Sequence, residues 1–247
     1  MSTPDSVTIV DLIRNGTMSS RMAAVLWAAV DARLSIVVVA IPRLAGKTTT
    51  FNAVLSLLPP DVPVHRLGAD QTEVGRLKEA ATGGYLVVPE FSRGPVPGYI
   101  WGEPVQRVFD AMTVGYSLVT SMHAPGLEET FNDICEGCGV ADEDASRIDL
   151  MLYILRFGED DETFWRRVSE IHEIDRVRDG RPEGRQLFKW VESDDRFEAV
   201  DTPVFLRGAE ADVERRRAML DELASSGRRS PEEVAQMALE FAEGSGR

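Results

Sequence analysis

The chain has 247 residues, of which 43% are hydrophobic, so it can bury one core, or one core and a small appendage, without disulfides or metals. Acidic side chains (41) outnumber basic ones (27), and the formal net charge of −14 argues against a general nucleic-acid-binding protein. Any anion site must therefore be local.

The start of the sequence indicates neither a signal peptide nor a membrane span. Residues 1–11 lack a basic segment and an apolar segment, and the uncharged apolar run over 34–42 is too short to cross a bilayer. We therefore expect a soluble, cytoplasmic protein without direct membrane insertion.

Helices and strands are predicted to alternate along residues 18–158. A helix over 18–33, with Ser19 as its N-cap, precedes a β-branched run over 34–40 that is typical of a strand buried on both faces. The next helix begins at Lys47 and ends before the proline pair at 59–60. Further strands are expected at 62–67, 84–90, 116–123 and 148–157, with helices at 72–81, 99–115 and 126–135. This alternation predicts an α/β fold, with a mostly parallel central sheet covered by helices on both faces.

The pattern changes after Gly158. Strands over 163–177 and 185–200, joined by a turn over 178–184, predict an antiparallel β extension. Two C-terminal helices follow at 209–227 and 230–244, and their alternating charges suit a solvated or a partner-facing surface, of which we favour the solvated one. Ser230, Pro231 and Glu233 provide an N-cap, a first-turn proline and a capping-box acid for the second helix. We divide the chain into a domain over 1–207 and a helical tail over 208–247.

The segment between the first strand and the following helix, "AIPRLAGKTTTF" over 40–51, partly matches the phosphate-loop pattern G-x-x-x-x-G-K-S/T. In this pattern backbone N–H groups converge on phosphate oxygens, the lysine reaches the terminal phosphates and the hydroxyl binds Mg²⁺. The alternative is an ordinary strand-to-helix turn, but a lysine there opposes the helix dipole and favours the phosphate site. The candidate phosphate-binding residues are Pro42, Arg43, Leu44, Ala45, Gly46, Lys47, Thr48 and Thr49.

Ile41 occupies the position of the first glycine of the pattern. A β-branched residue held at positive φ costs about 1–3 kcal/mol, which would weaken nucleotide binding by roughly ten- to a hundredfold. Either the loop is reshaped, with Pro42 and Arg43 redirecting it, or the binding is weak.

Cys135 and Cys138 form a C-x-x-C pair. A zinc site would need two more ligands, and His123 is the only nearby candidate. We favour two reduced thiols at a helix end or in a loop.

Taken together, these segments resemble the ATPase domain of the type II/type IV secretion and pilus-assembly ATPases, particularly the tight-adherence branch. The resemblance covers about residues 7–177 and includes four elements in the family's order. They are the Walker A region "GKTTTFNAVLSLLP", the Walker B strand "GYLVVPEF", the His box "AMTVGYSLVTSMHA" and the later strands "IDLMLYILRF" and "RRVSEIHEI". The resemblance implies a RecA-like P-loop NTPase fold that binds ATP and Mg²⁺.

The resemblance also implies roles for single residues. Lys47 would contact the β- and γ-phosphates, Thr48 would hold Mg²⁺, Glu90 would activate or position the attacking water, and His123 would sense the γ-phosphate. Glu90 is expected to end a buried strand next to the loop strand, at the edge where open α/β sheets bind ligands. The resemblance further implies a hexameric homo-oligomer that acts on an inner-membrane secretion or pilus platform protein, at the inner face of the membrane.

The departures from the family pattern lie in the segments that would bind the phosphates and the attacking water. Besides Ile41, Leu44 and Pro89 stand at glycine positions, and the acidic box between the Walker elements is reduced to Asp70 and Glu73. The N-terminal domain that completes the family's pocket is not recognisable, since some thirty residues precede the first core strand. Three arginines near these elements match no arginine-finger motif: Arg66, Arg76 and Arg93.

Two hypotheses follow. The chain is an ATP hydrolase that powers a secretion or pilus platform, or it is a hydrolysis-deficient nucleotide-binding or structural paralogue with a regulatory or assembly role. A P-loop kinase or GTPase is less well supported, because the sequence has neither an N-K-x-D motif nor an arginine-rich lid.

Overall fold

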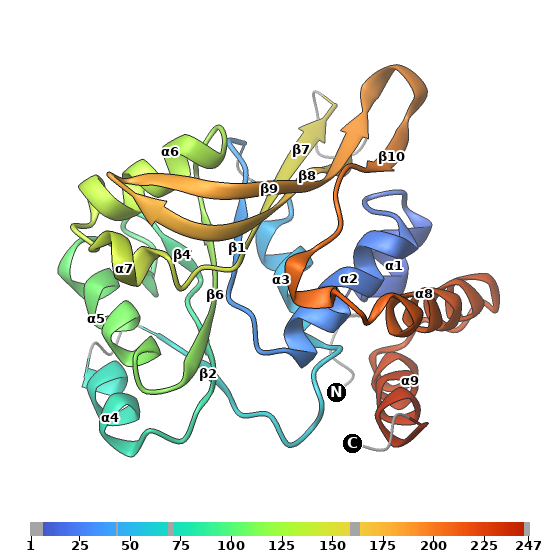
Figure 1. The fold of residues 1–247 in the computed structure, drawn as a ribbon, viewed down its shortest axis with the longest axis horizontal. Coiled ribbons are helices and arrows are strands. Elements are labelled where there is room, and N and C mark those ends of the chain that lie inside the picture. Colours follow the sequence, from blue (N-terminus) through green and yellow to red (C-terminus); the bar gives the residue numbers. More distant parts are fainter. Residues whose placement is uncertain (1–6, 43, 69–71, 159–163, 245–247) are drawn as a thin grey trace.

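The computed structural model describes residues 7–42, 44–68, 72–158 and 164–244 (Figure 1). Its centre is a ten-stranded sheet whose main path runs in the order β10-β9-β8-β7-β1-β6-β3-β2. The five strands from β7 to β2 are parallel, which confirms an α/β fold with a largely parallel sheet. They are β1 (Ile36–Val39), β2 (Val64–Arg66), β3 (Gly84–Val87), β6 (Tyr116–Met122) and β7 (Leu150–Phe157).

The strand expected over 84–90 is divided in two, and it does not lie next to the loop strand. β1 lies between β6 and β7, and β3 pairs with the far side of β6. β3 ends at Val87, and Glu90 begins a separate short strand, β4 (Glu90–Phe91). Pro89 explains the break, because proline has no N–H to donate to a strand ladder. The prediction that Glu90 ends a strand adjacent to β1 is therefore wrong.

A second short strand precedes the helix that was expected from residue 99. β5 (Tyr99–Ile100) pairs with β4, and α5 (Glu103–Met112) begins only after Gly102, whose φ is 69°. Pro104 lies in the first turn of α5. Proline is tolerated there because N–H groups of the first turn make no hydrogen bond within the helix.

Helices cover both faces of the sheet, as expected (Figure 1). Residues of β1 alternate between the two cores: Ile36 and Val38 face one cluster, and Val37 and Val39 face the other. The first cluster includes α1 (Ile9–Arg14), α2 (Ser20–Asp31), α3 (Lys47–Leu55), α8 (Glu210–Ser225) and α9 (Pro231–Gly244). The second includes α4 (Thr72–Ala80), α5, α6 (Leu127–Asn132) and α7 (Asp142–Ala145).

Helix caps follow the sequence signals closely. The Ser19 hydroxyl accepts the Met22 N–H, so the predicted N-cap of α2 is confirmed. Ser230 and Glu233 form the expected capping box at the start of α9. α1 was not predicted, although Thr8 and Asp11 form a capping box at its start.

The antiparallel extension is confirmed, with different strand limits. β8 (Trp165–Arg178) pairs with β7, and β9 (Arg181–Val191) pairs with β8 and with β10 (Arg196–Ala199). The single strand expected over 185–200 is interrupted near Asp195, which has a positive φ of 44°. The turn between β8 and β9 comprises Asp179 and Gly180, so most of the expected turn over 178–184 is strand.

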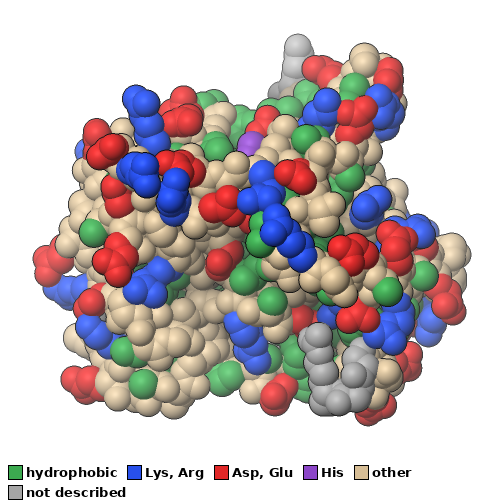
Figure 2. All heavy atoms as spheres, in the orientation of Figure 1, with side chains coloured by type: hydrophobic (Ala, Val, Ile, Leu, Met, Phe, Trp, Pro, Cys, Tyr) green, Lys and Arg blue, Asp and Glu red, His purple; other side chains and the backbone are tan. Residues whose placement is uncertain are grey.

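The C-terminal helices are not simply a solvated surface. Arg216 of α8 is 2% exposed, pairs with Asp31 of α2 at 2.5 Å and lies 4.0 Å from the Phe241 ring of α9. Helices α8 and α9 therefore share the core of α1 and α2, and the domain boundary at 207/208 stays a prediction. On the face shown in Figure 2, acidic and basic side chains are interspersed.

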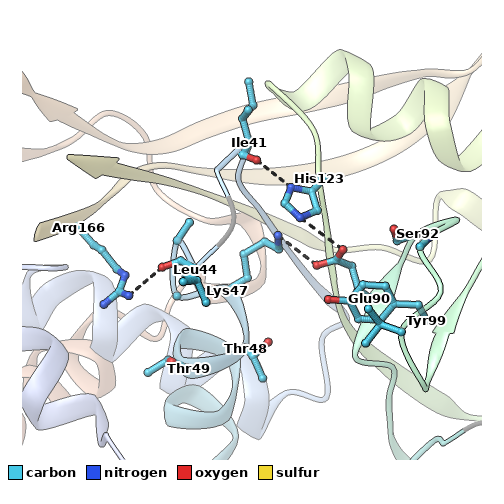
Figure 3. Close-up of a pocket in the computed structure, with 14 residues that line it drawn as sticks. Ile41, Leu44, Lys47, Thr48, Thr49, Glu90, Ser92, Tyr99, His123 and Arg166 are labelled. Atoms are coloured by element: carbon cyan, nitrogen blue, oxygen red, sulfur yellow. Dashed lines mark hydrogen bonds and ion pairs between the residues drawn. The ribbon is translucent and has the colours of Figure 1, made fainter. Parts of the chain in front are cut away.

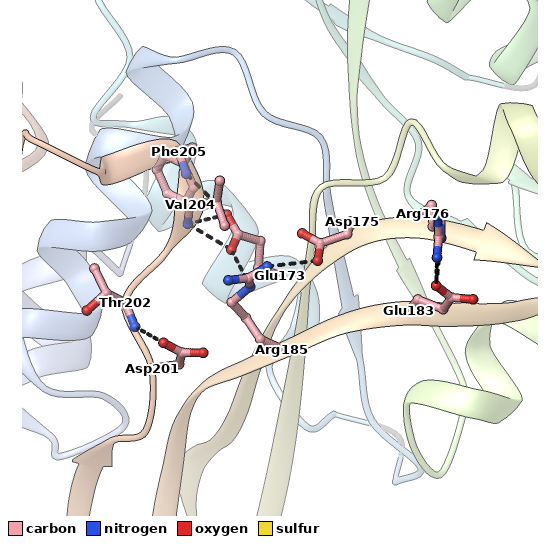
Figure 4. Close-up of polar contacts among 9 residues, drawn as sticks. All are labelled: Glu173, Asp175, Arg176, Glu183, Arg185, Asp201, Thr202, Val204 and Phe205. Atoms are coloured by element: carbon pink, nitrogen blue, oxygen red, sulfur yellow. Dashed lines mark hydrogen bonds and ion pairs between the residues drawn. The ribbon is translucent and has the colours of Figure 1, made fainter.

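A buried carboxylate anchors the segment that leads from β10 to α8 (Figure 4). Glu173 of β8 accepts the Val204 N–H at 2.9 Å and the Phe205 N–H at 3.3 Å, and Arg185 Nε lies 3.2 Å from it. Val204–Leu206 is a short 3-10 helix, so Glu173 satisfies N–H groups at its first turn. Among the described residues, no helix is both long enough and apolar enough to cross a membrane.

Candidate functional site

The segment that follows β1 forms a strand–loop–helix unit, as the phosphate-loop hypothesis requires. Gly46 has a φ of 90° and is the N-cap of α3, which begins at Lys47. The Thr50 N–H donates to the Gly46 carbonyl at 2.8 Å, while N–H groups of the residues before it have no partner within the helix. Phe51 is buried in the core and holds the helix in place. The start of α3 therefore presents N–H groups suited to an anion.

The strain predicted for Ile41 lies instead at Leu44. Ile41 is not among the described residues with positive φ, whereas Leu44 has a φ of 59°. Both side chains are exposed, at 56% and 69%, so neither is held by burial. The loop is thus reshaped: its left-handed residue is Leu44, three residues after Ile41.

A cavity of about 600 Å³ opens beside the loop (Figure 3). Its walls come from the loop and the start of α3, from the β4–β5 region with Tyr99, from the end of β6 and from the start of β8. The structure brings most of the predicted site residues together along this cavity: Leu44, Ala45, Gly46, Lys47, Thr48, Thr49, Glu90 and His123. Pro42 does not line it, and Arg43 lies outside the described residues.

Lys47 and Glu90 form a buried ion pair in the wall of the cavity. Lys47 Nζ lies 3.1 Å from Glu90 Oε2, and the two side chains are only 7% and 5% exposed. The other carboxylate oxygen, Oε1, is buried and has no hydrogen-bond partner. An unpartnered buried oxygen on a charged group is costly, and sites that retain one commonly use it.

His123 connects the loop to this pair. Its Nδ1 lies 2.8 Å from the Ile41 carbonyl oxygen, and because that oxygen only accepts, Nδ1 carries a proton. Nε2 lies 3.5 Å from Glu90 Oε1 (Figure 3). His123 therefore fixes the backbone at the position of the missing glycine while its other nitrogen faces the glutamate.

Arg166 is a cavity residue that the sequence analysis did not single out. Its Nη2 donates to the Leu44 carbonyl at 2.8 Å. Because β8 is antiparallel to β7, its first residues return to the edge where the parallel strands end. The "RRV" segment was noted only as part of the resemblance, and the return of β8 was the signal that could have placed it at the site.

The other arginines considered from the sequence do not line the cavity. Arg66 donates to Asn52 Oδ1, and Arg93 lies over the Trp101 ring. Glu73 lies on α4 and is not a cavity residue, and Asp70 is outside the described residues.

The cysteine pair lies away from the cavity wall, in and just after a π-helical turn over Asp133–Gly137. Both thiols are free, and burial raises the pKa of Cys135 to about 11. Such a thiol is protonated at neutral pH. In the part of the chain that the structure describes, no group of three or more His, Cys, Asp or Glu side chains is arranged to hold a metal ion.

Comparisons with known proteins leave the family of this chain open. No family model matches. The uncharacterized protein MJ1287 of Methanocaldococcus jannaschii is 29% identical over 136 residues, which cover 48% of this chain and 50% of that protein. The match therefore spans about half the length of this relative.

Solved structures with a partial likeness include ATPases. The Legionella pneumophila ATPase DotB gives a TM-score of 0.38 at 14% identity, covering 86% of this chain and 58% of that one. The VirB11 ATPase of the Brucella suis type IV secretion system gives 0.44 at 14% identity, covering 70% and 64%. Yersinia pseudotuberculosis DotB gives 0.38 at 12% identity, covering 94% and 63%. Likeness at this level establishes no function.

Proposed function

We propose that this chain is a RecA-like P-loop protein that binds Mg-ATP in the cavity beside the loop and hydrolyses it. The observation that carries the proposal is the buried Lys47–Glu90 pair, which faces the N-terminus of α3 in a cavity of about 600 Å³. That volume lies within the range of ordinary ligand pockets. A lysine, helix N–H groups and a hydroxyl at one edge of a parallel sheet together fit a phosphate chain.

The residues present fit both groups that the proposal requires. Lys47 and the N–H groups at the start of α3 would hold the phosphates, and the exposed Thr48 hydroxyl would hold the metal. Bound Mg²⁺ would supply charge neutralisation at the phosphate oxygens. Among the described residues Glu90 Oε1 has no hydrogen-bond donor, which supports a role in orienting the attacking water, and His123 Nε2 lies 3.5 Å from the same oxygen, close to where that water would bind. Phosphoryl transfer depends mainly on positioning and charge, so these few groups suffice.

The second candidate is a nucleotide-binding subunit without hydrolysis. It is favoured by one observation, the left-handed Leu44, which leaves an apolar side chain exposed on the cavity wall where a glycine would leave space. In that case the chain would regulate or assemble a larger machine. The resemblance supports a common setting for both candidates: a hexameric ring in the cytoplasm, at the inner face of the membrane, acting on a secretion or pilus platform protein.

The test is calorimetric titration of Mg-ATP together with steady-state phosphate release. Lys47→Ala is expected to weaken Mg-ATP binding by at least tenfold, because it removes a charged phosphate contact. Glu90→Gln is expected to retain binding and to lose turnover. Lys78→Ala is the matched control, since this exposed lysine pairs with Asp110 away from the cavity.

The outcomes separate the two candidates. Turnover in the wild type that disappears in both variants supports the hydrolase. Binding without turnover in the wild type, lost in Lys47→Ala, supports the nucleotide-binding subunit. Wild-type and Lys47→Ala proteins that bind equally weakly would exclude both.

A further inference from the structure

We propose that Arg166 is a second phosphate-binding cation of this site, so that a polyphosphate chain is held between Lys47 of α3 and Arg166 of β8. The inference rests on the proposed function, because it takes the cavity to be a nucleotide phosphate site. It adds a cation that comes from the antiparallel extension.

The first support is the position of the side chain. Arg166 lines the cavity and lies directly over Gly46, where an added Cβ would come within 2.9 Å of the arginine Cδ and Nε atoms. Its Nη2 bonds the Leu44 carbonyl, which places the guanidinium against the loop (Figure 3). The glycine at position 46 is therefore needed for the close approach of Arg166 as well as for its own positive φ.

The second support is that, in the described part of the chain, Arg166 has no counter-charge. Among the described residues no carboxylate pairs with Arg166, although the chain carries 41 acidic side chains. Its neighbour Arg167, by contrast, forms two hydrogen bonds with the Asp195 carboxylate, each at 2.7 Å. The Arg166 Nε atom is also buried without a hydrogen-bond partner. Among the residues that the structure describes, the cation that borders the cavity thus has no carboxylate partner, while the one beside it is paired with Asp195.

The third support is the local electrostatic cost. The Arg166 and Arg156 guanidinium groups lie 4.2 and 5.0 Å from the same ring, that of Phe164. Burial, and then repulsion from Arg156, lower the pKa of Arg166. A partly desolvated cation beside a second cation is stabilised by an incoming anion, and arginine matches the geometry of phosphate oxygens in particular.

A purely structural role is the competing explanation, since Arg166 already bonds the loop carbonyl of Leu44. Arg166→Gln separates the two roles. A glutamine amide can still donate to a backbone carbonyl, but it carries no charge for a phosphate. Arg167→Gln is the matched control, because it removes the same charge one residue away on a side chain that does not line the cavity.

The experiment titrates Mg-ATP and inorganic tripolyphosphate into the full chain and its variants over a range of salt concentrations. Arg166→Gln is expected to weaken both ligands by roughly ten- to a hundredfold, as for the loss of one charged hydrogen bond. It should also reduce the dependence of affinity on salt, because one charge contact is gone. Arg167→Gln should change affinity by less than about threefold and leave the salt dependence unaltered.

The controls keep a failure interpretable. Melting curves without ligand show whether Arg166→Gln still folds; if it does not, Arg166→Lys, which keeps the charge, should retain the salt dependence of the wild type. Unchanged affinity for both ligands in Arg166→Gln would overturn the inference, as would weakening of ATP but not of tripolyphosphate. If the wild type binds neither ligand, or Lys47→Ala binds as the wild type does, the proposed function itself fails.

Discussion

Single residues of the loop show that the position of strain could not be taken from the motif alone. The pattern assigns the conformational demand to Ile41, but the structure places the left-handed conformation at Leu44. His123 holds the Ile41 carbonyl and Arg166 holds the Leu44 carbonyl, so two side chains fix the backbone where the glycine is missing. Both contacts come from strands distant in sequence, which a local pattern does not encode.

Glycine substitutions at these two positions are expected to have opposite effects on stability. The left-handed conformation costs an L-residue about 1–2 kcal/mol of stability. Glycine avoids this cost, but the greater flexibility of the unfolded chain costs about 0.5–1 kcal/mol of stability. Leu44→Gly should therefore raise the free energy of unfolding by about 0.5–1 kcal/mol, and Ile41→Gly should lower it by a similar amount.

Urea unfolding of both variants beside the wild type measures this difference. Because both side chains are exposed, lost burial contributes little to either value. A loss of stability in Leu44→Gly equal to that in Ile41→Gly would show that the left-handed conformation carries no strain.

At the scale of elements, the periodicity of apolar residues predicted the strands and helices of the parallel part of the sheet. It did not predict the positions at which strands are interrupted. β1 and β6 were identified because continuous runs of apolar residues mark strands buried on both faces. The break at Pro89 was missed because the apolar residues before it, which include Val87 and Val88, suggest a continuous strand. Proline cannot donate a backbone hydrogen bond to the neighbouring strand, so the strand ends before it. The break near Asp195 was missed because a left-handed residue between two amphipathic strands leaves the alternation intact.

One buried cation connects α8 to α2. Arg216 is paired with Asp31 and stacked on the rings of Trp27 and Phe241, whereas its neighbour Arg217 forms exposed pairs with Glu214 and Asp221. Charge alternation along α8 predicted a solvated surface, because it cannot tell these two arginines apart.

Arg216→Ala is expected to lower the free energy of unfolding by about 3 kcal/mol or more, because it leaves the Asp31 carboxylate unpaired. Arg217→Ala, the matched control, should change it by less than about 1 kcal/mol. Chemical denaturation measures both values. If the two variants lose equal stability, the Asp31–Arg216 pair does not hold α8 in place.

For the whole molecule, the candidate site is assembled by topology. Lys47 follows β1, Glu90 begins β4, His123 follows β6 and Arg166 lies at the start of β8. Motif order was enough to predict the first three. Motif order could not predict that Arg166 lies at the site, because this position depends on the antiparallel pairing of β8 with β7.

A carboxyl group where the parallel and antiparallel strands meet should give stability a distinctive pH dependence. Burial raises the pKa of Asp149 to about 6, opposed by the hydrogen bond from the Ser35 N–H and reinforced by Glu173. The folded protein thus keeps a proton on Asp149 between about pH 4 and pH 6, where the unfolded chain has lost it. This group's contribution to stability therefore falls as the pH rises through that window, by about 3 kcal/mol in total.

Asp149→Asn removes the titration and keeps an oxygen that can accept the Ser35 N–H. The variant should gain stability relative to the wild type as the pH rises from 4 to 6, and keep that gain at pH 7. Asp110→Asn, at an exposed carboxylate, corrects for the loss of one negative charge. Urea unfolding across this range measures the difference; parallel curves for the wild type and Asp149→Asn would contradict it.

The buried ion pair between Lys47 and Glu90 should determine which anions can bind in the site. The lysine already has a carboxylate at 3.1 Å, so an entering anion must compete with a fixed negative charge that lies beside it. A chloride ion, with a single charge and no chain of oxygens, gains too little to displace that partner. A molecule with several linked negative charges engages the helix N–H groups at the same time, so we expect the site to select by valence and to stay free of the salt that surrounds it.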